Sequence, residues 1–169
     1  MHYTSWDRTD RDHPRLLVGE GPEVIGTFHE DSAEVDGLAW RLEVDEKEGA
    51  TATAEDGRVF NIKGNLRRAK RLEANVDGQL FTFINEQGAN WIIDDAQSNK
   101  VGQFTGTNNG VRAAILEFEQ PETPLPVETA AALSWFVRTI LENRLNNTAM
   151  AVIVGMGLCT LAAVVTFFT

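Results

Sequence analysis

The residues best placed to bind an anion form a short run rich in lysine and arginine. The chain has a formal net charge of −10, yet five of its cations fall within nine residues: Lys63, Arg67, Arg68, Lys70 and Arg71. On a surface close to a bilayer, each could attract anionic lipid head groups by about 1 kcal/mol. The same charges could instead form a solvated strand or turn that balances nearby carboxylates and discourages pairing at a sheet edge. The run is therefore a candidate lipid- or anion-binding site with a purely structural alternative.

The residue types that catalyse reactions or ligate metals are not arranged for either purpose. Three histidines are scattered without ligand spacing, and the single cysteine, Cys159, lies in an apolar segment. Asp94 and Asp95 with Asn99 lack the alternating acids, central glycine and closing glutamate of a calcium loop, so a turn is the better interpretation. No nucleophile elbow, phosphate loop or zinc-protease motif is present. We predict a non-enzymatic protein with no metal site and no cofactor.

The C-terminal segment predicts a membrane anchor. No charged residue follows Arg144, and residues 149–168 are almost wholly apolar. As a helix this stretch would be about 30 Å long, the thickness of the hydrocarbon core of a bilayer. Its nine Val, Ile, Leu and Phe residues favour insertion by roughly 3–5 kcal/mol. We predict a transmembrane helix over 147–169. Because Arg138 and Arg144 precede it, the positive-inside tendency predicts a tail-anchored, single-pass protein whose N-terminal domain is cytoplasmic.

Small residues recur at every fourth position of this segment, at Ala151, Gly155, Cys159 and Ala163. Such spacing places them on one helix face and lets two helices approach closely in lipid. The face could form a homodimer or bind another membrane protein. It could equally be ordinary membrane-helix composition, or suit a helix packed inside a barrel.

The region between the leader and the anchor has the pattern of an all-β domain. Turn signals recur about every ten residues, at Asp36-Gly37, Glu48-Gly49, Asp56-Gly57, Lys63-Gly64, Asp77-Gly78, Gln87-Gly88 and Asn109-Gly110. The stretches between them alternate apolar and polar residues. We predict a closed antiparallel β-barrel of roughly 10–12 short strands within residues 15–145, after a disordered leader over 1–14. The acidic net charge argues against a nucleic-acid partner.

A proline-rich break at residues 120–126 separates the strands from an amphipathic helix predicted over 127–143. A barrel of this size leaves a lumen too wide for its own side chains, so an apolar element must fill it. The candidate plug is the 127–143 helix, through Leu133, Trp135, Phe136, Val137 and Ile140. Alternatively the last segment, 147–169, is the plug and no membrane is involved.

The order of elements resembles the Tubby-like barrel superfamily, which includes LURP-one-related proteins and phospholipid scramblases. The resemblance covers roughly residues 15–145. It rests on Asp-Gly-type turns, the strand–turn–strand segment Trp91–Phe104 (WIIDDAQSNKVGQF), and a proline-rich exit into the apolar helix Pro126–Leu141. It implies a barrel of about a dozen strands around a hydrophobic C-terminal helix, in a superfamily where several members engage phosphoinositides or membranes. The second apolar segment departs from that pattern, and no lipid-binding residues of the family have a clear match here.

Taken together, these features predict a membrane-tethered, non-catalytic interaction module. Its partners would be anionic lipid head groups or a protein at the cytoplasmic membrane face. Two alternatives stay open. One is a soluble LURP-like barrel with the last helix as internal plug, and the other is a scramblase-like protein that translocates phospholipids.

Overall fold

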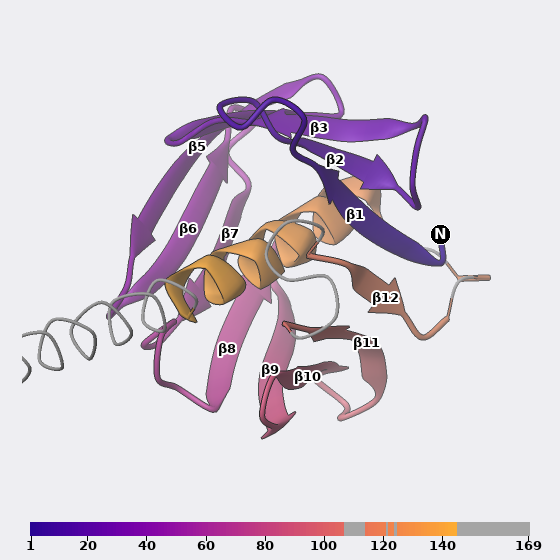
Figure 1. Cartoon of the computed structure of the whole chain (residues 1–169). Coiled ribbons are helices and arrows are strands. Elements are labelled where there is room, and N and C mark those ends of the chain that lie inside the picture. The colour runs from indigo at the N-terminus through magenta and orange to yellow at the C-terminus, as the bar shows by residue number, and fades with distance from the viewer. Residues whose placement is uncertain (107–113, 121, 124, 145–169) are drawn as a thin grey trace, which may run out of the picture.

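Twelve antiparallel strands form a closed barrel around one helix (Figure 1). The computed structural model describes residues 1–106, 114–120, 122–123 and 125–144. The strands are β1 (Tyr3–Asp7), β2 (Arg15–Val18), β3 (Val24–Phe28), β4 (Ser32–Val35), β5 (Leu38–Asp45), β6 (Gly49–Ala54), β7 (Val59–Lys63), β8 (Arg71–Val76), β9 (Gln79–Gln87), β10 (Asn90–Asp95), β11 (Lys100–Thr105) and β12 (Leu116–Phe118). Each strand pairs with the next along the chain, and β1 pairs with β12 to close the barrel. The predicted closed, mainly β barrel with a C-terminal helix is confirmed.

The strands alternate because one face meets the lumen and the other meets water. In β5, Trp40 and Leu42 are buried while Arg41 between them is exposed. In β6 the buried side chains are those of Ala50, Ala52 and Ala54, whose small size leaves room for the central helix. Gly49 begins β6 at a φ of +127°, where any Cβ would collide with the Ile62 carbonyl, so only glycine fits.

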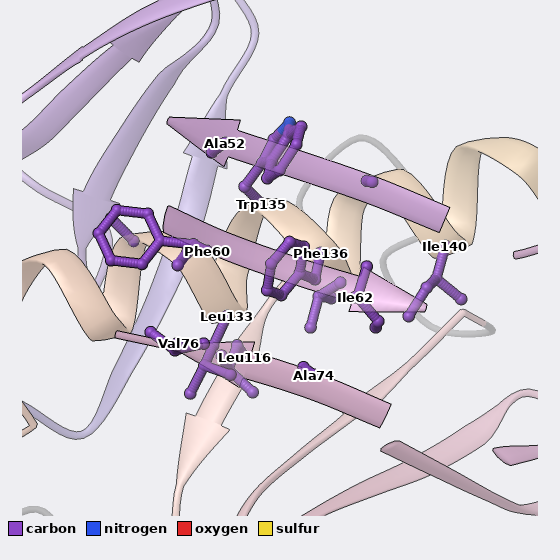
Figure 2. Close-up of a cluster of buried hydrophobic side chains, with 14 of the residues drawn as sticks. Ala52, Phe60, Ile62, Ala74, Val76, Leu116, Leu133, Trp135, Phe136 and Ile140 are labelled. Carbon is purple, nitrogen blue, oxygen red and sulfur yellow. The ribbon is translucent and has the colours of Figure 1, made fainter. Parts of the chain in front are cut away.

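The central helix spans residues 127–144 and fills the lumen (Figures 1 and 2). Every residue from 129 to 137 is buried, so this part of the helix is surrounded by strands on all sides. The residues predicted to plug the barrel are all 5 % exposed or less: Leu133, Trp135, Phe136, Val137 and Ile140. Of the two segments considered for this role, the 127–143 helix therefore occupies the lumen.

Polar as well as apolar contacts hold the helix in place. The Phe136 ring lies edge-on to that of Phe83, with their centroids 6.3 Å apart. The buried hydroxyls of Thr4 and Ser134 are 2.7 Å apart and share a hydrogen bond. Because a buried hydroxyl without a partner is costly, this pair fixes the helix against β1.

The prediction of a disordered leader over residues 1–14 is wrong. Residues 3–7 form β1, which closes the barrel, and residues 8–14 connect it to β2. Trp6 is 4 % exposed and packs edge-on against Phe28, with ring centroids 4.8 Å apart. β1 looks polar in the sequence partly because Thr4 is one of its buried residues. The Thr4 hydroxyl is hydrogen-bonded to Ser134 of the central helix.

The predicted anchor at 147–169, with its face of small residues, lies outside the described residues. Within the described part of the chain, no helix is long and apolar enough to cross a membrane.

The antiparallel order places alternate connections at the same end of the barrel. We call the end reached by Arg144 the tail-side end. It holds the β1–β2, β3–β4, β5–β6, β7–β8 and β9–β10 connections. The distal end holds the β2–β3, β4–β5, β6–β7, β8–β9 and β10–β11 connections and the start of the central helix.

Candidate anion-binding site at the tail-side end

The structure brings all five predicted cations into one loop. Lys63 ends β7, Arg71 begins β8, and the other three lie in the connection between them. We call residues 63–71 the basic loop. Its turn is held by Asn65, whose side-chain oxygen accepts a hydrogen bond from the Arg68 backbone N–H at 2.8 Å. Leu66 is fully buried beneath it. The cations therefore project from a defined turn that is fastened to the barrel.

Most of the charges in the basic loop have no partner within the described residues. Arg67 is half-buried and pairs with Glu46, with their nitrogen and oxygen 3.4 Å apart. The side chains of Lys63, Arg68, Lys70 and Arg71 are exposed and form no hydrogen bond or ion pair with any described residue. Such cations can meet an external anion without first breaking an internal pair.

Arg144 joins the end of the central helix to the basic loop. Its guanidinium donates a hydrogen bond to the Ala69 backbone carbonyl and lies over the Trp91 ring, 4.6 Å from the centroid. Partial burial lowers the pKa of Arg144 from its ordinary value, but an arginine keeps its charge at physiological pH. The first residue of the predicted anchor, Asn147, follows three positions later. Covalent geometry alone keeps the Cα atoms of these two residues within about 11 Å of each other.

The two ends of the barrel carry very different charge. Within the described residues, the carboxylates of the distal end are Glu20, Glu23, Asp36, Glu55, Asp56, Asp77, Asp94, Asp95, Glu119, Glu122 and Glu128, and its lysine and arginine residues are Arg58 and Lys100. At the tail-side end, the described cations are Arg8, Arg11, Arg15, Lys47, Arg138, Arg144 and the basic loop. The carboxylates there are Asp7, Asp10, Asp12, Glu30, Asp31, Asp45, Glu46, Glu48, Glu86 and Glu142. Thus the tail-side end is close to neutral and the distal end is strongly acidic.

Charge is also divided within the tail-side end. Its carboxylates gather in the β1–β2, β3–β4 and β5–β6 connections, whereas the β7–β8 connection is purely cationic. Several of these carboxylates are fixed by the turns they cap. Backbone N–H groups of Lys47 and Glu48, for example, hydrogen-bond to Asp45 and lower its pKa. The acidic side chains are therefore engaged locally, and the basic loop is a distinct patch.

Asp95 occupies the turn expected from the sequence. Its carboxylate accepts hydrogen bonds from the Asn99 side chain and from the backbone N–H groups of Asn99 and Gln97, which lower its pKa. No group of three or more metal-ligating side chains lies together in the described part of the chain.

Comparison with known proteins identifies no relative: no family model, curated protein or solved structure matches the chain. The likeness to the Tubby-like barrels stays a prediction from the sequence.

The sequence predicted the cations of the basic loop as a candidate site but did not predict the contact between Ala69 of the loop and Arg144 of the central helix. Arg144 entered only as a charge flanking the anchor, and its position over Trp91 depends on barrel closure. The acidic distal end was also missed, although a signal for it exists. The Asp36-Gly37, Asp56-Gly57 and Asp77-Gly78 turns are separated by two strands each, so an antiparallel barrel places them at one end.

Proposed function

We propose that the chain is a membrane-tethered, non-catalytic interaction module. The apolar segment 147–169 would insert into the bilayer, and the basic loop would hold the anionic head groups beside it. The single observation that supports this is the contact between Arg144 and Ala69. It places four cations that pair with no described residue next to Arg144, three positions before the predicted anchor begins.

The expected energies make the loop a useful addition to the anchor. Four cations at about 1 kcal/mol each would contribute roughly as much as the 3–5 kcal/mol expected from the apolar side chains. The acidic distal end would oppose this only weakly. A six-residue strand such as β8 keeps the ends roughly 15–20 Å apart, beyond the Debye length of about 8 Å at physiological ionic strength.

This orientation agrees with the positive-inside tendency, so we propose that the barrel lies in the cytoplasm. It also agrees with the proposed kinship to the Tubby-like barrels. The alternative of a soluble barrel plugged by the last helix was based on the need to fill the lumen. Residues 127–144 already fill it, so this argument no longer supports that alternative.

Membrane attachment is tested first, by carbonate extraction of native membranes carrying the full-length chain. An integral anchor keeps the protein in the pellet. Release into the supernatant as a compact species would contradict the tether, whatever the basic loop does.

The basic loop is tested by partition of the full-length chain into phosphatidylcholine vesicles with or without phosphatidylserine. The wild type should prefer the anionic vesicles, and R68Q/R71Q should lose about 30-fold of that preference, the equivalent of two surface cations. A matched control, R41Q/K100Q, removes the same charge from sites away from the tail-side end. The proposed role of the loop fails if both variants lose the preference equally, or if the wild type does not distinguish the vesicles.

A further inference from the structure

The distal end contains a groove that the membrane proposal does not use. It lies between the β8–β9 turn, the β10–β11 turn and the segment joining β12 to the central helix, and encloses about 610 Å³. This volume is within the range of about 300–1,000 Å³ typical of ligand sites. Its apolar floor is formed by Leu80, Phe81, Val101, Phe118 and Leu125. We call it the distal groove.

Leu80 is the part of the floor most open to water. Its 56 % exposure is the highest of the large hydrophobic side chains in the described part of the chain. The neighbouring Phe81 also lines the groove but is almost completely buried. The two residues are consecutive in β9, so their side chains leave opposite faces of the strand. The exposed Leu80 side chain gains free energy when a ligand covers it.

Carboxylates surround the groove, although its lining also includes Lys100 and the amino-terminal Met1, which has a partner of its own. Asp77 and Glu122 are next in sequence to the lining residues Gly78 and Thr123, and their carboxylates form no ion pair or hydrogen bond with a described residue. Lys100 lines the groove but is already paired with Glu119, with their nitrogen and oxygen 3.1 Å apart. The hydrogen bonds that lower the pKa of Asp95 keep that lining residue ionised as well.

We propose that the distal groove binds a short segment of a partner protein that carries lysine or arginine beside apolar side chains. The apolar side chains would cover Leu80, and the cations would face the carboxylates of the rim. The openness of Leu80 and the wide spread of negative charge favour an extended polypeptide. The inference goes beyond the membrane role and does not depend on it. If the tail-side end does face the bilayer, the groove faces away from it and is accessible to such a partner.

The test uses the full-length chain in nanodiscs of neutral lipid and a display library of random octapeptides, with counter-selection on empty discs. The selected peptides should be enriched in lysine or arginine together with leucine, isoleucine, valine or phenylalanine. One selected peptide is then synthesised, labelled and titrated by fluorescence anisotropy. A selection that enriches nothing, or enriches acidic peptides, overturns the proposal.

Two variants locate the binding. L80N removes the exposed apolar side chain at unchanged charge and should raise Kd about 10-fold. D77N/E122Q should raise Kd by about 5- to 10-fold at low ionic strength and by less at high salt. The control E20Q/E55Q removes two exposed distal carboxylates outside the groove and should change Kd by less than about 2-fold.

If D77N/E122Q and E20Q/E55Q raised the Kd of the peptide equally, the peptide would be attracted non-specifically to the acidic end. That result would overturn the proposal. Unchanged binding by both L80N and D77N/E122Q would overturn it too. A second copy of this chain could also reach the groove through its own basic loop. Salt-sensitive self-association without peptide, abolished by R68Q/R71Q, would identify that occupant and reject a separate partner.

Discussion

The two ends of the central helix are held by different contacts. Glu128 at the distal end forms an ion pair with Arg58, whereas Arg144 at the tail-side end contacts an aromatic ring and a backbone carbonyl, and a longer ion pair of 3.7 Å joins Glu142 to Arg8 nearby. Glu128 accepts a hydrogen bond from Arg58 at 3.0 Å, and this contact raises the pKa of the arginine. Arg144 instead contacts the Trp91 ring and the Ala69 carbonyl. Both placements suit the helix dipole, with the acid at the N-terminal end and the base at the C-terminal end.

The difference shows how one small barrel can present a nearly neutral end with a cationic patch and a strongly acidic end. An aromatic ring or a carbonyl holds Arg144 without cancelling its charge. Other tail-side arginines do pair with carboxylates (Arg8, Arg15, Arg67 and Arg138), so the cations left without a partner among the described residues are mainly those of the basic loop. At the distal end, the arginine and the lysine of the described residues, Arg58 and Lys100, are both paired with carboxylates, and the remaining carboxylates outnumber the cations.

Weakening the packing of the central helix should destabilise both ends of the barrel, because both ends contact this helix. F136A deletes a fully buried ring at the centre of the helix and should lower the free energy of unfolding by about 3–5 kcal/mol. The measurement is urea unfolding of the full-length chain in detergent micelles, followed by tryptophan fluorescence. V127A, at a site 37 % exposed, should cost less than about 1 kcal/mol. Similar unfolding curves for the two variants would show that the helix is not the core.

Salt should separate the two attachments of the helix. R144Q loses the ring contact and most of the carbonyl contact, and should cost about 1–2 kcal/mol at any ionic strength. R58Q loses a partly exposed ion pair and should cost about 1 kcal/mol at low salt and less at high salt. Unfolding midpoints at several salt concentrations measure both. R68Q removes an exposed cation that pairs with no described residue. It is the control and should leave stability nearly unchanged.

If the costs of R144Q and R58Q fell together with added salt, both ends of the helix would be held by ordinary surface electrostatics. The contrast between the ends would then have no energetic meaning.

The smallest effect concerns Asp7, a tail-side carboxylate where β1 meets the β1–β2 connection. Asp7 accepts hydrogen bonds from the Thr9 hydroxyl, the Thr9 backbone N–H and the Arg15 guanidinium, which lower its pKa from 3.8 to about 2. The Asp7 carboxylate therefore binds a proton less readily in the folded protein than in the unfolded chain. Its contribution to the free energy of unfolding is complete above about pH 4 and disappears as the pH falls through about 2.

We therefore expect D7N to be less stable than the wild type at neutral pH, with the difference vanishing at strongly acidic pH. Urea unfolding across this pH range measures it. D12N, in the same connection, changes a carboxylate that accepts no hydrogen bond from a described residue, so it should show no such trend. A D7N deficit that stayed constant down to pH 2 would contradict the assignment to the Asp7 carboxylate.

The sequence revealed the elements that are defined locally. Regular turn signals and period-two alternation predicted the strands from β2 onward, and the proline-rich break predicted where the helix starts. The helix is also predicted by the need to fill a wide barrel. Those inferences depend on neighbouring residues, which a single sequence displays directly.

The features that were missed depend on pairing between distant residues. β1 is only five residues long, and it is stabilised by pairing with β12 more than a hundred residues away. The contact of Arg144 with Ala69 likewise requires the closed barrel. The acidic distal end could have been predicted from alternate turns, but only with every intervening strand counted correctly.

The central helix follows all twelve strands in the chain, so the strands are synthesised before the helix that fills the barrel and covers their apolar inner faces. Until then those faces, including Trp40 and Phe83, have no native partner at the centre. Pairing of β1 with β12 is also among the most non-local contacts in the chain, and such contacts form slowly. A growing polypeptide of this kind depends on being shielded until its last quarter has emerged.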